Sequence, residues 1–125
     1  MNPQKNTNRK VLITFTQEEY KYFSHIFHLL DYEKKGKIRS DSVFYFLRDS
    51  RLSDKVIKEL FILISQKDIY YIDIEEFFLL LRLVALAQNN IPFNVNSLQK
   101  NNPIPPLPIF IFLQKTNLIK KENLF

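Results

Sequence analysis

The sequence lacks cysteine and tryptophan and contains a single glycine, and these absences exclude several kinds of chemistry. Without cysteine the chain forms no disulfide, holds no metal through thiolates and has no thiol nucleophile. One glycine is too few for a glycine-rich loop that cradles a phosphate group. No apolar run approaches the roughly 18 residues that cross a bilayer, and the polar, basic stretch Met1 to Lys10 is not a secretory signal. The sequence therefore predicts a cytoplasmic protein.

The excess of positive charge is small and spread along the chain. Eighteen lysines and arginines stand against 13 acidic residues, which gives a net charge of +5. We interpret this as a solvated surface, with weak contact to an anionic membrane as the alternative. No predicted helix carries the arginine-rich face of nucleic-acid-binding proteins, so we expect no nucleic-acid partner.

Capping patterns and apolar periodicity predict a first helix and a second one after a short loop. Thr16 and Glu19 form a capping-box pattern, and the helix that they begin should end near Leu30. A second helix is predicted from Ser40 to Asp49. The only glycine, Gly36, falls in the loop between the two helices.

The same signals predict a third and a fourth helix. Either Ser53 or Asp54 caps the third helix. Asp73 and Glu76 form a second capping-box pattern at the start of the fourth, which should fray at residues 88–90.

Each of the two predicted helical hairpins contains a three-residue extended piece centred on an isoleucine, Lys37-Ile38-Arg39 in the first and Tyr71-Ile72-Asp73 in the second. Two such pieces would pair as a minimal antiparallel ribbon, and pairing the hairpins would bury the apolar faces of both. We therefore predict an all-α fold: a pair of EF-hand-like helix–loop–helix units with a two-stranded ribbon between their loops, plus a proline-rich C-terminal tail.

Composition divides the chain into a polar flexible arm at 1–11, the helical unit at 12–98 and a proline-rich and apolar tail at 99–125. Overlapping Pro-x-x-Pro patterns run from Pro103 to Pro108 and could dock on a polyproline-binding groove, but we favour a stiff linker. The apolar run 109–113 would either pack back on the helices or mediate self-association.

Both loops match the EF-hand calcium template poorly. Calcium takes about six to eight oxygen ligands. In the first loop, residues 31–42, Asp31 and Glu33 are suitable ligands, but two cations and a serine occupy the other ligand positions: Lys35, Arg39 and Ser42.

In the second loop, residues 65–76, Asp73 and Glu76 are suitable, whereas Lys67 and Ile69 are not, and Tyr70 replaces the glycine of the template. We expect no cofactor; if calcium binds, its ligands are Asp31, Glu33, Asp73 and Glu76. Packing and turn hydrogen bonds should take the ion's place.

No set of residues predicts catalysis. His25 and His28 lie three apart on the first helix without a nearby carboxylate or nucleophile, which is typical of surface or core-edge histidines. The helix dipole accounts for the acidic residues around Asp73. We predict that the protein is not an enzyme.

The pattern over residues 14–98 resembles the EH domain, the epidermal-growth-factor-receptor substrate homology domain. The stretches that carry the resemblance are Tyr20–Phe27 with Leu30-Asp31, Gly36-Lys-Ile38, Phe46-Leu47, Val56–Phe61, and above all Glu75–Gln88 followed by Ile91-Pro92.

The resemblance implies an adaptor module that binds Asn-Pro-Phe-type peptides of partner proteins in endocytosis or vesicle trafficking, peripherally at the plasma membrane or at endocytic vesicles. The family's pocket positions carry over to Leu47, Ile57 and Phe61, although the pattern alone favours core positions for them. Phe61 stands where the family usually has tryptophan, and the change removes ring area and an N–H donor. The alternatives are a calcium-binding EF-hand regulatory protein and a structural dimerisation module.

Overall fold

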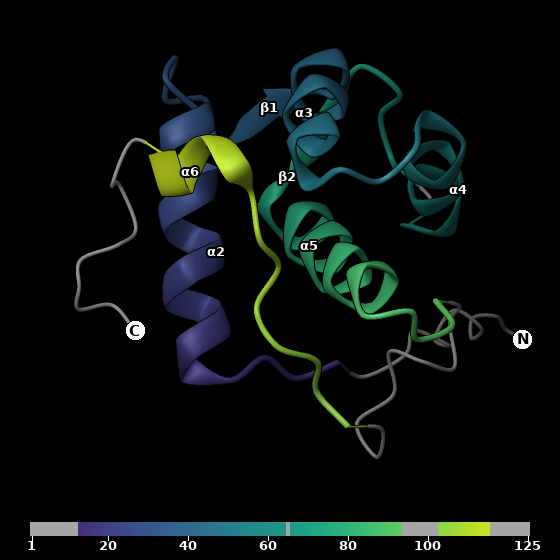
Figure 1. Cartoon of the computed structure of the whole chain (residues 1–125). Helices are drawn as coiled ribbons and strands as arrows, with labels where there is room; N and C mark the ends of the chain where they lie inside the picture. The colour runs from purple at the N-terminus through teal and green to yellow at the C-terminus, as the bar shows by residue number, and fades with distance from the viewer. Residues whose placement is uncertain (1–12, 65, 94–102, 116–125) are drawn as a thin grey trace, which may run out of the picture.

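The computed structural model describes residues 13–64, 66–93 and 103–115. The predicted arm at 1–11 and the rest of the tail lie outside these ranges. The described chain is helical, with one small ribbon (Figure 1). Its helices are α2 (Gln17–Leu30), α3 (Ser40–Leu47), the 3₁₀ turn η1 (Arg48–Ser50), α4 (Asp54–Ile64), α5 (Ile74–Gln88) and α6 (Ile111–Lys115). The all-α prediction is confirmed, and no described helix is both long and apolar enough to span a membrane.

Side-chain caps fix where the helices begin. Thr16 and Glu19 form the predicted capping box of α2, in which each side chain accepts the other's backbone N–H at 3.0 and 2.9 Å. Asp73 and Glu76 do the same for α5, both at 2.9 Å. Of the two candidates for α4, Ser53 is the cap, because its hydroxyl accepts the backbone N–H of Val56.

The predicted ribbon joins the two loops. Strands β1 (Lys37–Arg39) and β2 (Tyr71–Asp73) pair antiparallel, with Ile38 opposite Ile72. Both isoleucines point into the core, while their neighbours in β1 are exposed. The ribbon therefore fixes the two helical hairpins against each other.

Helix α5 is the centre of the core. Nearly all of its residues from Glu76 to Leu86 are buried, and it packs against both α2 and α4. Edge-on aromatic contacts join it to α2, with ring centroids 5.5 Å apart between Phe23 and Phe78 and 5.6 Å apart between Phe27 and Phe77. Phenylalanine thus supplies much of the contact between the first and last helices of the two hairpins.

A buried ion pair also ties α2 to α5. The guanidinium of Arg82, 4% exposed, donates to both carboxylate oxygens of Glu19, 3% exposed, each at 2.7 Å. It also donates to the carbonyl of Thr14 and lies 4.9 Å from the ring centroid of Phe15. These contacts tie the beginning of the described chain to α5. Removing either member of the pair would leave the other as an unpaired buried charge, which is strongly destabilising.

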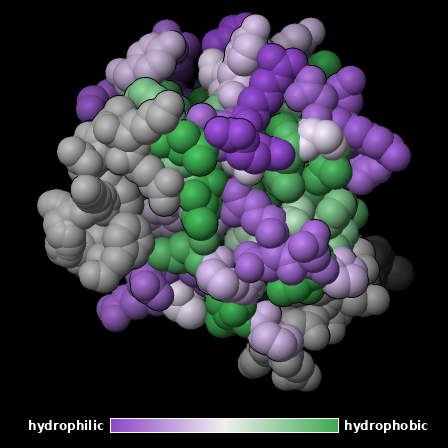
Figure 2. Space-filling view, viewed as in Figure 1, coloured by the Kyte–Doolittle hydropathy of each residue, from purple (hydrophilic) through white to green (hydrophobic). Residues whose placement is uncertain are grey.

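The tail folds back over the helices. Residues 103–110 run against α2 and α5 and lead into α6, and Phe110 and Leu113 belong to the hydrophobic core (Figure 1). Hydrophobic residues gather in the middle of the face on which the tail lies (Figure 2). Residues 103–113 are therefore part of the packed structure, because Pro105, Pro108, Phe110 and Leu113 find buried positions. The stiff linker favoured for Pro103–Pro108 is not what the structure has, and of the two alternatives for 109–113 the run packs back on the helices.

Candidate functional site

The first loop is closed by one carboxylate. The side chain of Asp31 accepts the backbone N–H of Lys35 at 2.9 Å and that of Gly36 at 2.8 Å. Burial acts to raise the pKa of this carboxyl, but the two backbone N–H groups outweigh it, and the pKa lies below its usual value. Gly36 has φ = +77°, a left-handed conformation that glycine adopts without strain. The second predicted ligand, Glu33, pairs with Lys35 at 3.3 Å.

The second loop is closed by a lysine and two carboxylates. The Lys67 ammonium lies 2.7 Å from the Asp73 carboxylate, and Glu76 accepts the backbone N–H groups of Lys67 and Asp73, both at 2.9 Å. Burial raises the pKa of Asp73, but Lys67 and the backbone N–H of Glu76 lower it further, to below its usual value. The lysine thus binds a carboxylate that would bind calcium in the template.

These contacts bear on the predicted alternative of a calcium site. Asp31 and Glu33 belong to the first loop and Asp73 and Glu76 to the second, and all four already have partners in the protein. A small open pocket of about 30 Å³ lies beside the first loop, between Asp31 and Tyr71. Among the described residues no acidic and histidine side chains form a cluster suited to a metal ion.

Of the predicted pocket residues, Leu47 lies on α3 and Ile57 and Phe61 lie one turn apart on α4, and not all of them reach the surface. Leu47 and Ile57 are both 0% exposed, whereas Phe61 is half buried. The ring of Phe61 lies beside that of Phe44, with centroids 6.0 Å apart, and Phe44 is also half buried. Leu47 and Ile57 thus belong to the core, while Phe44 and Phe61 expose part of an aromatic surface.

An arginine borders this aromatic surface. Arg48 lies 5.5 Å from the ring centroid of Phe44 and 5.4 Å from that of Tyr45, and it binds both carboxylate oxygens of Asp54 at 3.1 and 2.8 Å. Through this hydrogen bond the guanidinium lowers the pKa of Asp54 below its usual value. Phe44 and Arg48 were not predicted from the sequence as site residues. Their spacing of four, from Phe44 in α3 to Arg48 at the start of η1, places an aromatic residue before a cation and is the signal that could have found them.

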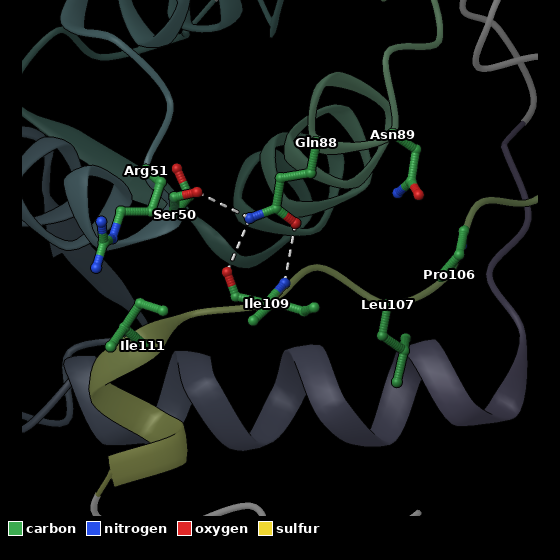
Figure 3. A pocket seen from close by; sticks show the side chains of 8 residues that line it. All are labelled: Ser50, Arg51, Gln88, Asn89, Pro106, Leu107, Ile109 and Ile111. Atoms are coloured by element: carbon green, nitrogen blue, oxygen red, sulfur yellow. Dashed lines mark hydrogen bonds between the residues drawn. The ribbon is translucent and has the colours of Figure 1, made fainter.

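A second concave region lies where the tail crosses the end of α5 (Figure 3). It is a pocket of about 190 Å³ between η1, the end of α5 and the tail. The Gln88 amide occupies its centre, donating to the carbonyls of Ser50 at 3.1 Å and Ile109 at 2.8 Å and accepting the N–H of Ile109 at 2.9 Å (Figure 3). No residue predicted as a site residue lines it.

Comparison with known proteins decides the family. The family model described as the EH domain matches residues 15–122. The chain belongs to the EH domain family. The match extends past the boundary predicted at residue 98 and takes in the tail that packs on the helices.

Two kinds of relative agree with this EH domain assignment. The chain is 33% identical to the epidermal growth factor receptor substrate 15 homolog of Dictyostelium discoideum. The matched region covers 69% of this chain and 8% of that protein. It is 29% identical to the RalBP1-associated Eps domain-containing protein 1 of mouse and of human. Here the matched region covers 79% of this chain and 12% of each relative. The chain therefore spans only a small part of the curated relatives that it matches.

A solved structure supports the fold of the EH domain. The N-terminal EF-hand domain of AtEH1/Pan1 from Arabidopsis thaliana matches with a TM-score of 0.55 over 75% of this chain and 97% of that one. The two are 22% identical, so this likeness concerns the fold alone. The predicted EF-hand-like pair and the predicted resemblance are both confirmed.

Proposed function

We propose that this EH domain is a protein–protein interaction module that binds short peptides of the Asn-Pro-Phe type between α3 and α4. It would serve as an adaptor in endocytosis or vesicle trafficking, without enzymatic activity. The observation that carries the proposal is the half-buried aromatic pair formed by Phe44 and Phe61. We propose Phe61 as the residue that the peptide touches, with Leu47 and Ile57 as the rigid support below.

The packing suits capture of an aromatic side chain. Phe44 and Phe61 expose part of their rings at the surface, while the fully buried Leu47 and Ile57 belong to the core that supports them. A ring that docks there removes apolar area from water on both partners and gains aromatic contact. The tight turn of an Asn-Pro segment is already rigid, so little conformational entropy is lost on docking.

Arg48 would bind the backbone of the same peptide. Its guanidinium has five N–H donors, and its contacts with Asp54 use those on Nε and Nη2. The remaining donors suit a carbonyl oxygen next to the docked ring. The ion pair with Asp54 would hold the guanidinium beside Phe44 before the peptide arrives.

An NMR titration of the ¹⁵N-labelled chain with an Asn-Pro-Phe peptide tests the proposal. We expect shifts at the amides of Phe44, Leu47, Ile57 and Phe61, and none with a matched Asn-Pro-Ala peptide. Phe61→Ala should weaken binding by more than about 1 kcal/mol, because a central aromatic contact is lost. Tyr70→Ala, which removes an exposed ring from the second loop, is the control and should leave the affinity unchanged. Absence of shifts at millimolar peptide would refute the proposal.

The identity of residue 61 sharpens this experiment. Tryptophan offers a larger ring and an N–H donor. Phe61→Trp should therefore tighten binding of the Asn-Pro-Phe peptide. Equal or weaker binding by this variant would mean that the ring at residue 61 is not part of the contact.

A further inference from the structure

The tail segment Pro108-Ile109-Phe110 is held in the way that a groove holds an extended peptide. Residues 103–110 are neither helix nor strand, so their backbone groups need partners from elsewhere. Three other parts of the chain provide contacts to this segment: α2, α3 and α5.

Two of these contacts bind the backbone. The hydroxyl of Tyr22 donates to the carbonyl of Pro108 at 2.6 Å. The Gln88 amide both donates to and accepts from the backbone of Ile109, at 2.8 and 2.9 Å, as a neighbouring β-strand would (Figure 3). Because these bonds reach only main-chain atoms, any residue other than proline can satisfy them at position 109.

The third contact binds a side chain. Phe110 is 0% exposed, and its ring lies 4.4 Å from that of Phe46, centroid to centroid. Pro108 is buried as well, whereas Ile109 is 52% exposed and borders the pocket of about 190 Å³. The enclosed positions are therefore the first and third residues of the segment, and the middle one faces open space.

We infer that this EH domain has a second peptide groove, formed by Tyr22, Phe46 and Gln88, that binds Pro-x-Phe segments and is filled by its own tail. The partner that fits is an extended segment of another protein with proline and, two residues later, phenylalanine. Such a segment enters when residues 108–110 leave. The tail itself shows which chemistry the groove accepts.

This groove is separate from the site proposed between α3 and α4. Phe46 contacts Phe110 of the tail, whereas Phe44 contacts Phe61 of α4. Helix α3 thus carries one aromatic residue for each surface. A partner on one surface and a segment in the other would use different residues, and the inference does not depend on the proposed function.

The test frees the groove in the full-length chain. Phe110→Ala removes the buried ring of the tail but keeps Tyr22, Phe46 and Gln88. We expect a synthetic peptide of residues 103–113 to bind this variant, with NMR shifts at Tyr22, Phe46 and Gln88. The wild-type chain should bind the peptide at least about tenfold more weakly, because its own tail competes at high effective concentration.

Matched peptides and variants check the specificity. A peptide with Phe110→Ala should bind the freed groove at least about tenfold more weakly, as expected for loss of a buried aromatic anchor. Replacing Ile109 by serine in the peptide should change little. Gln88→Glu in the Phe110→Ala chain should weaken binding, because a carboxylate cannot donate to the carbonyl of Ile109. Phe61→Ala is the control and should have no effect on this peptide.

A second form of the experiment covers the case in which Phe110→Ala fails to fold. A protease site inserted within residues 94–102 lets the chain fold intact and then be cut, and a labelled peptide of residues 103–113 should exchange with the cut tail. A folded chain that takes up no peptide at about 1 mM in either form would overturn the inference. So would shifts confined to Phe44 and Phe61.

Discussion

The two loops have the same backbone pairing but are closed by different groups. In the first loop a single carboxylate, Asp31, binds two backbone N–H groups, and Gly36 turns the chain. In the second loop Glu76, at the opposite end of the template, binds two backbone N–H groups, and Lys67 pairs with Asp73. The difference shows that an EF-hand loop can keep its shape when either its first or its last carboxylate remains. Substitutions at matched positions of the two loops can break this division of roles.

The largest expected effect comes from the last position of each loop. Glu76→Ala should lower the free energy of unfolding by about 2–4 kcal/mol, because it leaves two backbone N–H groups without their charged acceptor and removes half of a capping box. Ser42→Ala, at the same position of the first loop, should cost less than about 0.5 kcal/mol. Urea denaturation of both variants measures the contrast, and equal losses would contradict it.

Asp31 should dominate the first loop, and its effect should depend on pH. Because the pKa values of Asp31 and Asp73 are lower in the folded chain than in the unfolded one, the unfolded state binds more protons. The stabilisation is complete at neutral pH and is lost as the pH falls below about 4.

Asp31→Asn should therefore lower the melting temperature at pH 7 by several degrees and change it far less at pH 3. Thermal unfolding at the two pH values measures this, with Glu59→Gln, an exposed residue of α4, as the control. A loss that is the same at both pH values would mean that the charge of Asp31 is not what closes the loop.

The residue at the sixth template position, Gly36 in the first loop and Tyr70 in the second, should affect the free energy of unfolding only in the first loop. Gly36→Ala places a side chain at φ = +77° with no atom within 4 Å, so backbone strain alone should cost about 1 kcal/mol. Tyr70 occupies the same template position in the second loop, has no positive φ and is 69% exposed. Tyr70→Ala should change the unfolding free energy by less than about 0.5 kcal/mol. A costly Tyr70→Ala would reveal a role for this ring that the fold does not explain.

The smallest effect should come from the lysine of the second loop. Both members of the Lys67–Asp73 pair are partly exposed to solvent, so Lys67→Met should destabilise the chain only slightly and less in high salt. Calcium added to the wild-type chain should give a flat calorimetric trace, because Lys67 and Lys35 place cations where the template needs oxygen ligands. Micromolar binding would restore the calcium-regulated alternative.

Local patterns predicted much of the fold. The two capping boxes and the helix order depend on residues a few positions apart, whose preferences survive in the folded chain. The ribbon was predicted from the matching place of an extended, isoleucine-centred piece in each hairpin. The limit appears at Ser53 and Asp54, where either residue is a good cap, and the ion pair of Asp54 with Arg48 leaves the capping role to Ser53.

Apart from the ribbon, the specific contacts between distant side chains were not predicted. The apolar run at 109–113 did not reveal that Phe110 would pack on Phe46, because nothing local marks its partner. Leu47 and Ile57 were predicted as pocket residues from the family resemblance, although the apolar pattern alone favoured core positions, and both are fully buried. Arg82 carries a signal of its own, because a lone charge in the apolar part of a long helix requires a buried partner, but nothing local names Glu19 as that partner.

The ion pair between Glu19 and Arg82 has a consequence for folding during synthesis. Glu19 leaves the ribosome 63 residues before Arg82, so the first helical hairpin emerges while its future partner is still inside the exit tunnel or not yet made. A carboxylate without that partner stays hydrated, because burying it alone is strongly unfavourable. The N-terminal hairpin of a nascent chain therefore remains open at this end, and α2 reaches its final position only after translation has passed α5.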